Sequence, residues 1–136
     1  MRHEQLIVHA DGGSRGNPGP AAIGVVITTP TGVLLYEKGA VIGHATNNQA
    51  EYRALIHAFG AAREFAPTAI DVRLDSQLVV EQMQGNYRVR SAHIKPLWEQ
   101  ALAGAAALGS QITYTHVQRR LNSHADRLVN EALDRK

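Results

Sequence analysis

Hydrophobic positions in the first third of the chain form the short runs that are typical of β-strands. Residues 6–10 (LIVHA) form a β-prone run, which we expect to end at Asp11 because a loop rich in glycine and proline follows. Residues 23–29 and 33–43 flank the turn at residues 30–32 (PTG), and this arrangement predicts an antiparallel hairpin. The chain is therefore expected to begin with three consecutive strands.

Helical spacing replaces this pattern in the middle of the chain. Apolar side chains recur every three or four positions over residues 48–65, which predicts an amphipathic helix. Residues 70–74 (IDVRL) then form a short, largely apolar strand that ends at Asp75. A second helix is expected over residues 78–84.

The last third adds a helix over residues 96–108, an alternating strand over 111–117 and a final helix from Asn122. The order of elements is thus βββαβααβα. Hairpin strands pair antiparallel, whereas strands joined through helices pair in parallel, so we expect an α/β fold with a mixed five-stranded sheet flanked by helices. Residues 1–136 show no repeat or linker, and a single domain is expected.

Composition excludes several kinds of chemistry. The 14 Lys and Arg against 12 Asp and Glu give a formal net charge of +2, which is too small to indicate a nucleic-acid binder by itself. Because cysteine is absent, disulfides, thiolate zinc sites and a cysteine nucleophile are excluded. The sequence shows no signal peptide and no run of about 18 apolar residues, so we expect a cytoplasmic protein without a membrane partner.

Four acidic residues are candidates for chemistry, although each also has a local structural explanation. Asp11 and Asp75 follow strands, where the ligand crevices of α/β sheets form, but aspartate also favours turns and helix caps. Glu51 lies three residues after Asn48, a spacing typical of a capping box, yet it also heads the apolar stripe of its helix. Asp126, in the first turn of the last helix, suits the helix dipole. Each local explanation stays open for each acid taken alone.

Taken together, the four acids indicate a metal site. Carboxylates gathered at one place repel one another and raise one another's pKa unless a cation holds them. Mg²⁺ prefers oxygen ligands, and a pair of such ions can activate water and stabilise the leaving oxygen of a phosphodiester. The pattern alone does not bring the four acids together, so their convergence is a prediction.

Four longer motifs follow one another along the chain: DGGSRGNPGPAAIG at 11–24, TNNQAEYRAL at 46–55, LDSQLVVEQM at 74–83 and NSHADRLVNEAL at 122–133. In this order they resemble type 1 ribonuclease H, in the shorter branch of stand-alone bacterial and archaeal enzymes. The resemblance implies the ribonuclease H-like fold and hydrolysis of the RNA strand of RNA–DNA hybrids, leaving 5′-phosphate and 3′-hydroxyl ends. It also implies two Mg²⁺ ions per site, with Mn²⁺ as a candidate substitute; we further expect a monomer without an organic cofactor.

The resemblance assigns roles to the four acids. Asp11, Glu51, Asp75 and Asp126 match the metal-binding tetrad of the family. By this analogy Asp11 bridges both ions, and Asp126 helps to hold the ion that activates water. Glu51 and Asp75 hold the ion on the leaving-group side.

Two further residues near the last motif are candidates for catalysis. The mobile histidine loop of longer family members is absent here, and Arg119 stands at a position that looks typical of the shorter branch. His124 is a candidate proton shuttle because imidazole titrates near neutrality, although a histidine at a helix start is more often inert. The long basic segment of many relatives is also reduced, to GNYRVRSAHIKP at 85–96, whose bases are candidates for weaker, salt-sensitive phosphate contacts.

RNA differs from DNA in its 2′-hydroxyl, which a protein reads across the shallow minor groove of an A-like duplex. Glycines in the first loop allow the backbone to approach such a substrate closely. The positions expected from the resemblance to contact the hybrid are Gly12, Gly13, Asn17, Thr46, Asn47, Asn48, Ser76, Gln77 and Asn122.

Other functions fit the sequence less well. The glycine-rich loop has neither the GK[ST] ending of a P-loop nor the GxGxxG spacing, and a strand follows it instead of a helix. Two alternatives stay open: a module that binds hybrids without cutting them, and a nuclease that also cleaves double-stranded RNA.

Overall fold

The computed structural model describes residues 3–135, which contain one mixed sheet and its covering helices. The strands are β1 (Gln5–Ser14), β2 (Gly19–Thr28), β3 (Leu34–Ala45), β4 (Ala69–Leu74) and β5 (Gln111–His116), and the helices are α1 (Asn47–Ala62), α2 (Gln77–Met83), α3 (Lys95–Leu108) and α4 (Ser123–Asp134). Short 3₁₀ turns, Arg63–Phe65 and Arg119–Asn122, follow α1 and precede α4. The element order expected from the sequence is confirmed.

The five strands lie in the order β3-β2-β1-β4-β5. β2 pairs antiparallel with both β1 and β3, whereas β4 pairs in parallel with both β1 and β5. The sheet is thus mixed, as expected, because the first three strands are joined by short connections and the last two by helices.

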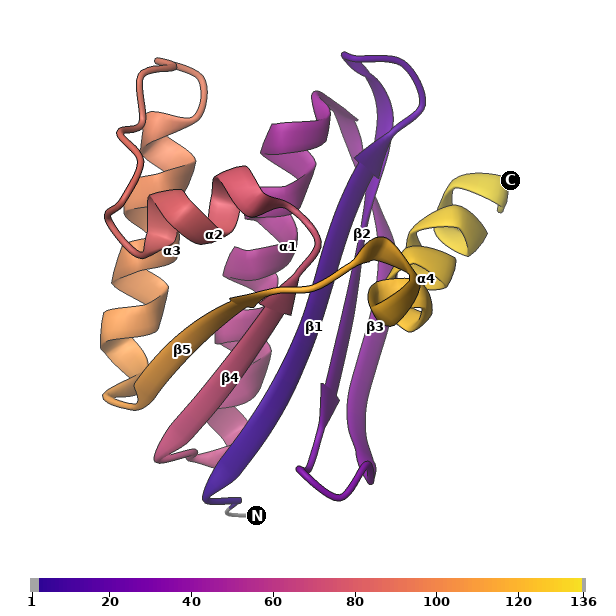
Figure 1. The fold of residues 1–136 in the computed structure, drawn as a ribbon. Coiled ribbons are helices and arrows are strands. Elements are labelled where there is room, and N and C mark those ends of the chain that lie inside the picture. The colour runs from indigo at the N-terminus through magenta and orange to yellow at the C-terminus, as the bar shows by residue number, and fades with distance from the viewer. Residues whose placement is uncertain (1–2, 136) are drawn as a thin grey trace.

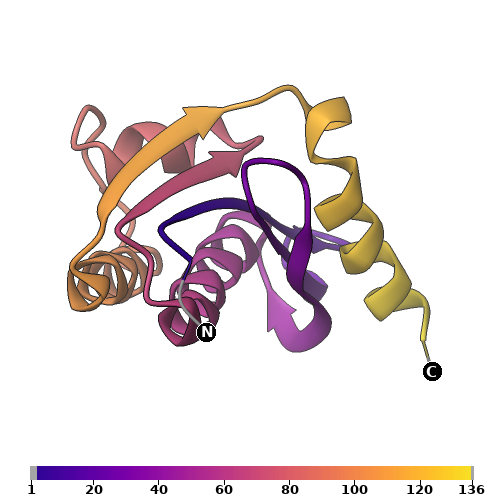
Figure 2. The same ribbon diagram turned by 90° about the horizontal axis from the view of Figure 1, so that it is seen from below.

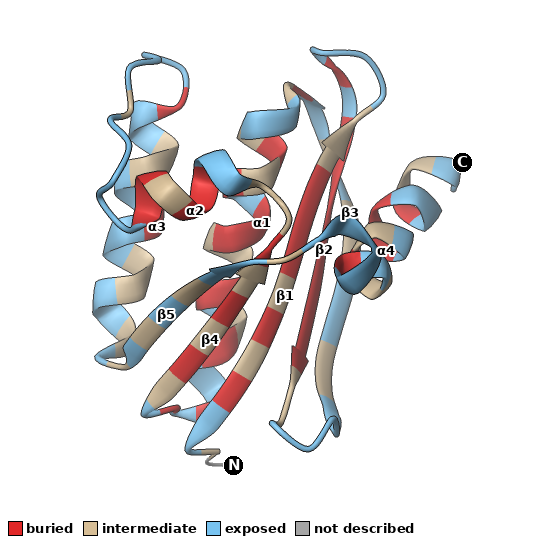
Figure 3. Cartoon of the chain, in the orientation of Figure 1, coloured by how far each residue is buried: buried red, intermediate tan, exposed pale blue. Residues whose placement is uncertain are grey.

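Helices cover the two faces of the sheet unequally. α1 and α3 pack together on one face, and α4 lies on the other face across β2 and β3 (Figure 1, Figure 2). The main core fills the space between the sheet and α1, where Leu6 and Val8 of β1 meet Leu55 and Phe59 of the helix. Buried positions accordingly follow the central strands and the inner side of α1 (Figure 3).

The first strand does not end at Asp11, contrary to the expectation from the sequence. β1 continues to Ser14, and its backbone pairs with β2 from Ile7 to Ser14, with Asp11 opposite Gly24 and Ser14 opposite Ala21. Glycines that looked like loop residues are therefore held in a strand by ladder hydrogen bonds. The parallel pairing with β4 runs only as far as His9. Asp11 thus lies where β1 has lost its partner on that side, next to the end of β4.

The helix caps also differ from two of the structural explanations considered above. Thr46, not Asn48, caps α1: its side chain accepts from the Gln49 amide at 3.1 Å, and the Gln49 side chain accepts from the Thr46 amide at 2.9 Å. Glu51 is consequently not part of a capping box. Ser76 caps α2 by accepting from the Val79 amide, so Asp75 is not the cap.

Among residues 3–135, no helix is both long and apolar enough to cross a membrane. The single domain expected over residues 1–136 stays a prediction, and residues 1, 2 and 136 lie outside the described residues.

Candidate active site

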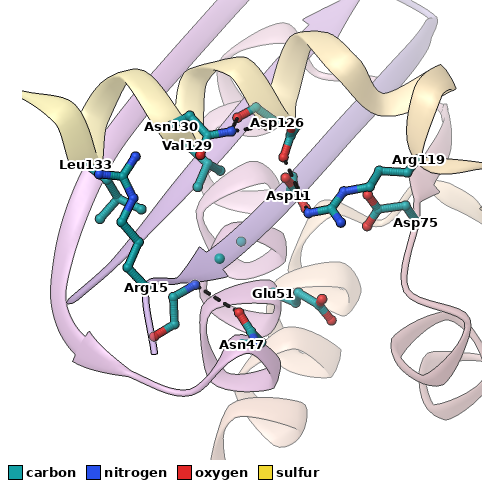
Figure 4. A pocket seen from close by; sticks show the side chains of 13 residues that line it. Asp11, Arg15, Asn47, Glu51, Asp75, Arg119, Asp126, Val129, Asn130 and Leu133 are labelled. Atoms are coloured by element: carbon teal, nitrogen blue, oxygen red, sulfur yellow. Dashed lines mark hydrogen bonds and ion pairs between the residues drawn. The ribbon is translucent and has the colours of Figure 1, made fainter. Parts of the chain in front are cut away.

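A cleft of about 380 Å³ brings together the four acids identified in the sequence (Figure 4). Asp11 comes from β1, Glu51 from α1, Asp75 from the residue after β4, and Asp126 from α4. The lining is completed by Gly12, Gly13, Ser14, Arg15, Asn47, Arg119, Val129, Asn130 and Leu133. Four segments far apart in the sequence thus contribute one carboxylate each.

Strand alternation turns Asp11 toward the side of α4, and a missing side chain at Gly12 lets α1 bring Glu51 close to the same strand. Because successive side chains of a strand point to opposite faces, the buried Ala10 faces α1 and Asp11 faces the side of α4. The next residue, Gly12, lies directly against α1, where a Cβ would stand 2.2 Å from the carbonyl carbon of Ala50. Glycine is therefore required for the first turn of α1, and with it Glu51, to approach β1 this closely.

A second close approach positions Asp126. A Cβ at Gly24 of β2 would stand 2.2 Å from the carbonyl oxygen of Ala125, the residue before Asp126. The bare backbone of β2 at this point lets the first turn of α4 lie against the sheet. Since Gly24 pairs with Asp11 in the ladder, the same contact brings Asp126 to Asp11.

Asn122 supports the cleft from below rather than lining it. Its side chain is 1% exposed, and its Nδ2 donates to the carbonyl oxygen of Ala10 at 3.0 Å. Its Oδ1 lies 2.9 Å from Nδ1 of His9, and because an amide oxygen only accepts, the imidazole donates from Nδ1. These two hydrogen bonds connect the start of α4 to β1, and the expectation that Asn122 contacts substrate stays a prediction.

Burial raises the pKa of three carboxyl groups in the cleft, those of Asp11, Glu51 and Asp75. Burial raises the pKa of Asp11 to about 8, and the nearby charges of Asp75 and Asp126 add to the shift. Burial also raises the pKa of Glu51 to about 7. The pKa of Asp75 is raised by burial too, although the cation of Arg119 opposes the shift. The cleft therefore favours either protons or added cations at neutral pH.

The residues present fit a hard divalent cation. All four candidate ligands are carboxylates, and Oε2 of Glu51 is buried without a hydrogen-bond partner within the described part of the chain. Residues 3–135 hold no compact group of three acidic or imidazole side chains in the present arrangement.

Comparison with known proteins places this geometry in a family. Residues 9–132 match the family model described as "Reverse transcriptase-like". The chain is 46% identical over 130 residues to "Ribonuclease HI" of Halobacterium salinarum, covering 93% of this chain and 64% of that protein. It is 43% identical to "LC11-RNase H1 in complex with RNA/DNA hybrid", with a TM-score of 0.91 and coverage of 95% of this chain and 96% of that one. The chain belongs to the ribonuclease H family.

The length of some relatives differs from that of this ribonuclease H chain. The "Bifunctional protein Rv2228c" of Mycobacterium tuberculosis is 45% identical over 131 residues, which cover 96% of this chain but only 36% of that protein. The chain thus spans about a third of this relative and less than two thirds of the Halobacterium one. The ribonuclease H-like fold expected from the sequence is confirmed.

The two other catalytic candidates occupy different places in this ribonuclease H fold. Arg119 lines the cleft, with its Nη2 3.8 Å from Oδ1 of Asp126 and its side chain 81% exposed (Figure 4). His124 does not line the cleft, and its Nε2 lies 3.0 Å from Oε1 of Glu37 on β3. The placement supports a role for Arg119 and gives no support to His124 as a proton shuttle.

The residues expected to contact substrate fall into three groups. Gly12 and Gly13 line the acid cleft, as does Asn47. A neighbouring hollow of about 430 Å³ is lined by Asn17, Thr46, Asn47, Asn48, Ser91, His93 and Ile94. Ser76 and Gln77 line neither hollow. Six of the nine expected contacts therefore line the acid cleft or the hollow that shares Asn47 with it.

Three polar residues that line the cleft, Ser14, Arg15 and Asn130, were not predicted from the sequence. Asn130 lies four residues after Asp126 on α4, and its Nδ2 donates to the backbone oxygen of Asp126 at 3.1 Å and lies 3.4 Å from Oδ2. The i, i+4 spacing on a helix is a signal that identifies this pair. Arg15 stands in the glycine-rich loop four residues after Asp11, where only its charge distinguishes it.

Proposed function

We propose that this chain hydrolyses the RNA strand of RNA–DNA hybrids with two divalent cations, and that it leaves 5′-phosphate and 3′-hydroxyl ends. The observation that carries the proposal is the convergence of Asp11, Glu51, Asp75 and Asp126 in one cleft of a ribonuclease H fold. A relative with 43% identity is named as a complex with an RNA/DNA hybrid, which supports the substrate class. The monomeric state and the cytoplasmic location stay predictions.

The four carboxylates would hold two Mg²⁺ ions, for which Mn²⁺ is a candidate substitute. When bound, such ions supply a water nucleophile of lowered pKa and stabilise charge on the phosphate. Asp11 is central and nearly inaccessible, at 7% exposed, which suits a ligand shared by both ions. Asn130 steadies Asp126 through its amide, and the exposed Arg119 can donate to phosphate oxygens at the rim.

The test is cleavage of an end-labelled RNA strand paired with DNA, with RNA–RNA and DNA–DNA duplexes as controls. Wild type and Asp11→Asn are compared in Mg²⁺, Mn²⁺ and EDTA. We expect cutting of the hybrid that disappears with EDTA and with Asp11→Asn. Tight binding of the hybrid without cutting in either metal would instead identify an inactive hybrid-binding module.

The chemistry of the ends and the breadth of substrate are read from the same reactions. Products that a 5′-phosphate-dependent exonuclease degrades carry the expected 5′-phosphate. Equal cutting of RNA–RNA duplexes would extend the substrate class to double-stranded RNA. The absence of ends with 5′-phosphate would contradict the proposed hydrolysis.

A further inference from the structure

Arg15 occupies a place that neither the metal site nor the substrate contacts discussed above explain. It lies in the short connection between β1 and β2, and its Nη2 is 2.7 Å from Oδ1 of Asp134 at the end of α4. The side chain crosses the end of the cleft toward α4, beside Leu133 (Figure 4). It is still 49% exposed, so the guanidinium stays accessible from solvent.

Because an ion pair this exposed adds little to the free energy of unfolding, stability does not explain why the Arg15 guanidinium lies here. Among the described residues that line the cleft, Arg15 and Arg119 are the two bases. Arg119 lies among Asp11, Asp75 and Asp126, whereas Arg15 lies apart from these acids, toward Leu133 (Figure 4). Four carboxylates and two divalent ions cancel in formal charge, so the metal site alone leaves no net attraction for the phosphates on either side of the cut.

We propose that Arg15 binds a phosphate of the RNA strand next to the scissile one, at the end of the cleft away from Arg119. The inference rests on the proposed function, because the strand that enters the cleft is the strand that is cut. Asp134 engages one nitrogen of the guanidinium and fixes its position, and the other N–H groups remain to donate to phosphate oxygens. The ion pair with Asp134 thus prepares the phosphate site before substrate binds.

The test compares Arg15→Ala with Arg15→Lys and with a matched control, Arg127→Ala. Arg127 is an exposed arginine of α4 that pairs with Glu131 at 3.5 Å and does not line the cleft. For Arg15→Ala we expect KM for the hybrid to rise about five- to tenfold and the slope of log KM against log salt to fall by about one. Arg15→Lys keeps the charge and should restore the slope, while Arg127→Ala should resemble wild type.

A second measurement locates the contact. Hybrids with a single uncharged methylphosphonate linkage in the RNA strand remove one phosphate charge at a time. For wild type, one such linkage near the cut should raise KM about as much as Arg15→Ala raises it with the unmodified hybrid. The same linkage should not raise the KM of Arg15→Ala further. Equal, additive losses in both proteins at every linkage, or an unchanged salt slope in Arg15→Ala, would overturn the proposal. If wild type does not cut the unmodified hybrid, that result would instead contradict the proposed function.

Discussion

Asp11 and Asp71 lie on neighbouring strands of one sheet, yet their surroundings shift the pKa values of the two carboxyl groups in opposite directions. Asp71, on β4, accepts from Nε of Arg73 at 2.9 Å and from the hydroxyls of Thr115 at 2.9 Å and Thr113 at 3.2 Å. Burial alone would raise its pKa, but the hydrogen bonds from Arg73 and Thr115 outweigh it and hold the pKa below the ordinary value. Asp11 is more deeply buried, and its neighbours are other acids.

The difference separates a structural acid from an acid kept for a ligand. A fold that stabilises a partly buried carboxylate surrounds it with donors, as it does for Asp71. Around Asp11 the fold instead gathers Glu51, Asp75 and Asp126, each of which makes the charge of Asp11 more costly. Such an arrangement is expected where function requires an added cation rather than stability.

The largest effect should fall on catalysis. Asp11→Asn is expected to lower cleavage of an RNA–DNA hybrid by at least about 10³-fold, because it removes the proposed shared ligand of the ions. Asp71→Asn, a matched change on the next strand, should leave the rate within about threefold of wild type. Single-turnover cleavage with saturating enzyme measures both. Similar losses in the two variants would mean that the comparison does not separate function from structure.

Asn122 sharpens the comparison, because it is a buried polar group near the cleft that is fully paired like Asp71. Asn122→Leu leaves the Ala10 carbonyl and the Nδ1–H of His9 without partners. We expect the free energy of unfolding to fall by about 2–4 kcal/mol, measured by urea denaturation. Asn86→Ala, which removes an exposed asparagine bonded to Glu81, is the control and should cost less than about 0.5 kcal/mol. A neutral Asn122→Leu would refute the supporting role.

When metal is removed by EDTA, the contributions of Asp11 and Asp71 to the free energy of unfolding should change with pH in opposite directions. The raised pKa of Asp11, about 8, means that the folded state binds its proton more tightly than the unfolded state does. The contribution of Asp11 to stability is therefore lost as pH rises from about 4 to 8, and Asp11→Asn should be more stable than wild type at pH 8 by at least about 1 kcal/mol.

The lowered pKa of Asp71 gives the opposite result. Its contribution is present above the unfolded pKa of about 4 and is lost as pH falls through the folded pKa. Asp71→Asn should therefore be less stable than wild type at pH 7 by about 1 kcal/mol, and the gap should close in acid. Thermal unfolding of the three proteins between about pH 2 and 8, a range that extends below the folded pKa of Asp71, measures these curves. Parallel curves for all three would contradict the assigned pKa directions.

The sequence predicted the elements better than it predicted how they meet. Hydrophobic periodicity is a local property, so the order of strands and helices could be read from it. The extension of β1 through Asp11 to Ser14 could not, because the glycines there are held by pairing with β2, a contact between distant residues. The resemblance, rather than any pattern, indicated that the four acids meet in one cleft.

What the sequence missed depends on tertiary contacts of single residues. Asn122 was expected at the start of the last helix and as a substrate contact, and only the packing of α4 on the sheet buries it against the Ala10 carbonyl. The capping role assigned to Asn48 belongs to Thr46, two residues earlier, since either residue type can cap a helix. Gly12 was expected to admit substrate, whereas its bare backbone also admits α1.

The smallest effect is expected at His124, which tests where the functional region ends. Its imidazole pairs with Glu37 on the edge strand at 3.0 Å, and both side chains are about two fifths exposed, at 40% and 42%. His124→Ala should change stability by less than about 0.5 kcal/mol, because an ion pair this exposed contributes little. Turnover should stay within about twofold of wild type from pH 6 to 9, measured at saturating hybrid. A tenfold loss of turnover that depends on pH would instead mean that His124, outside the acid cleft, transfers a proton. The contact between α4 and β3 would then be functional, like the surroundings of Asp11, and not structural, like those of Asp71.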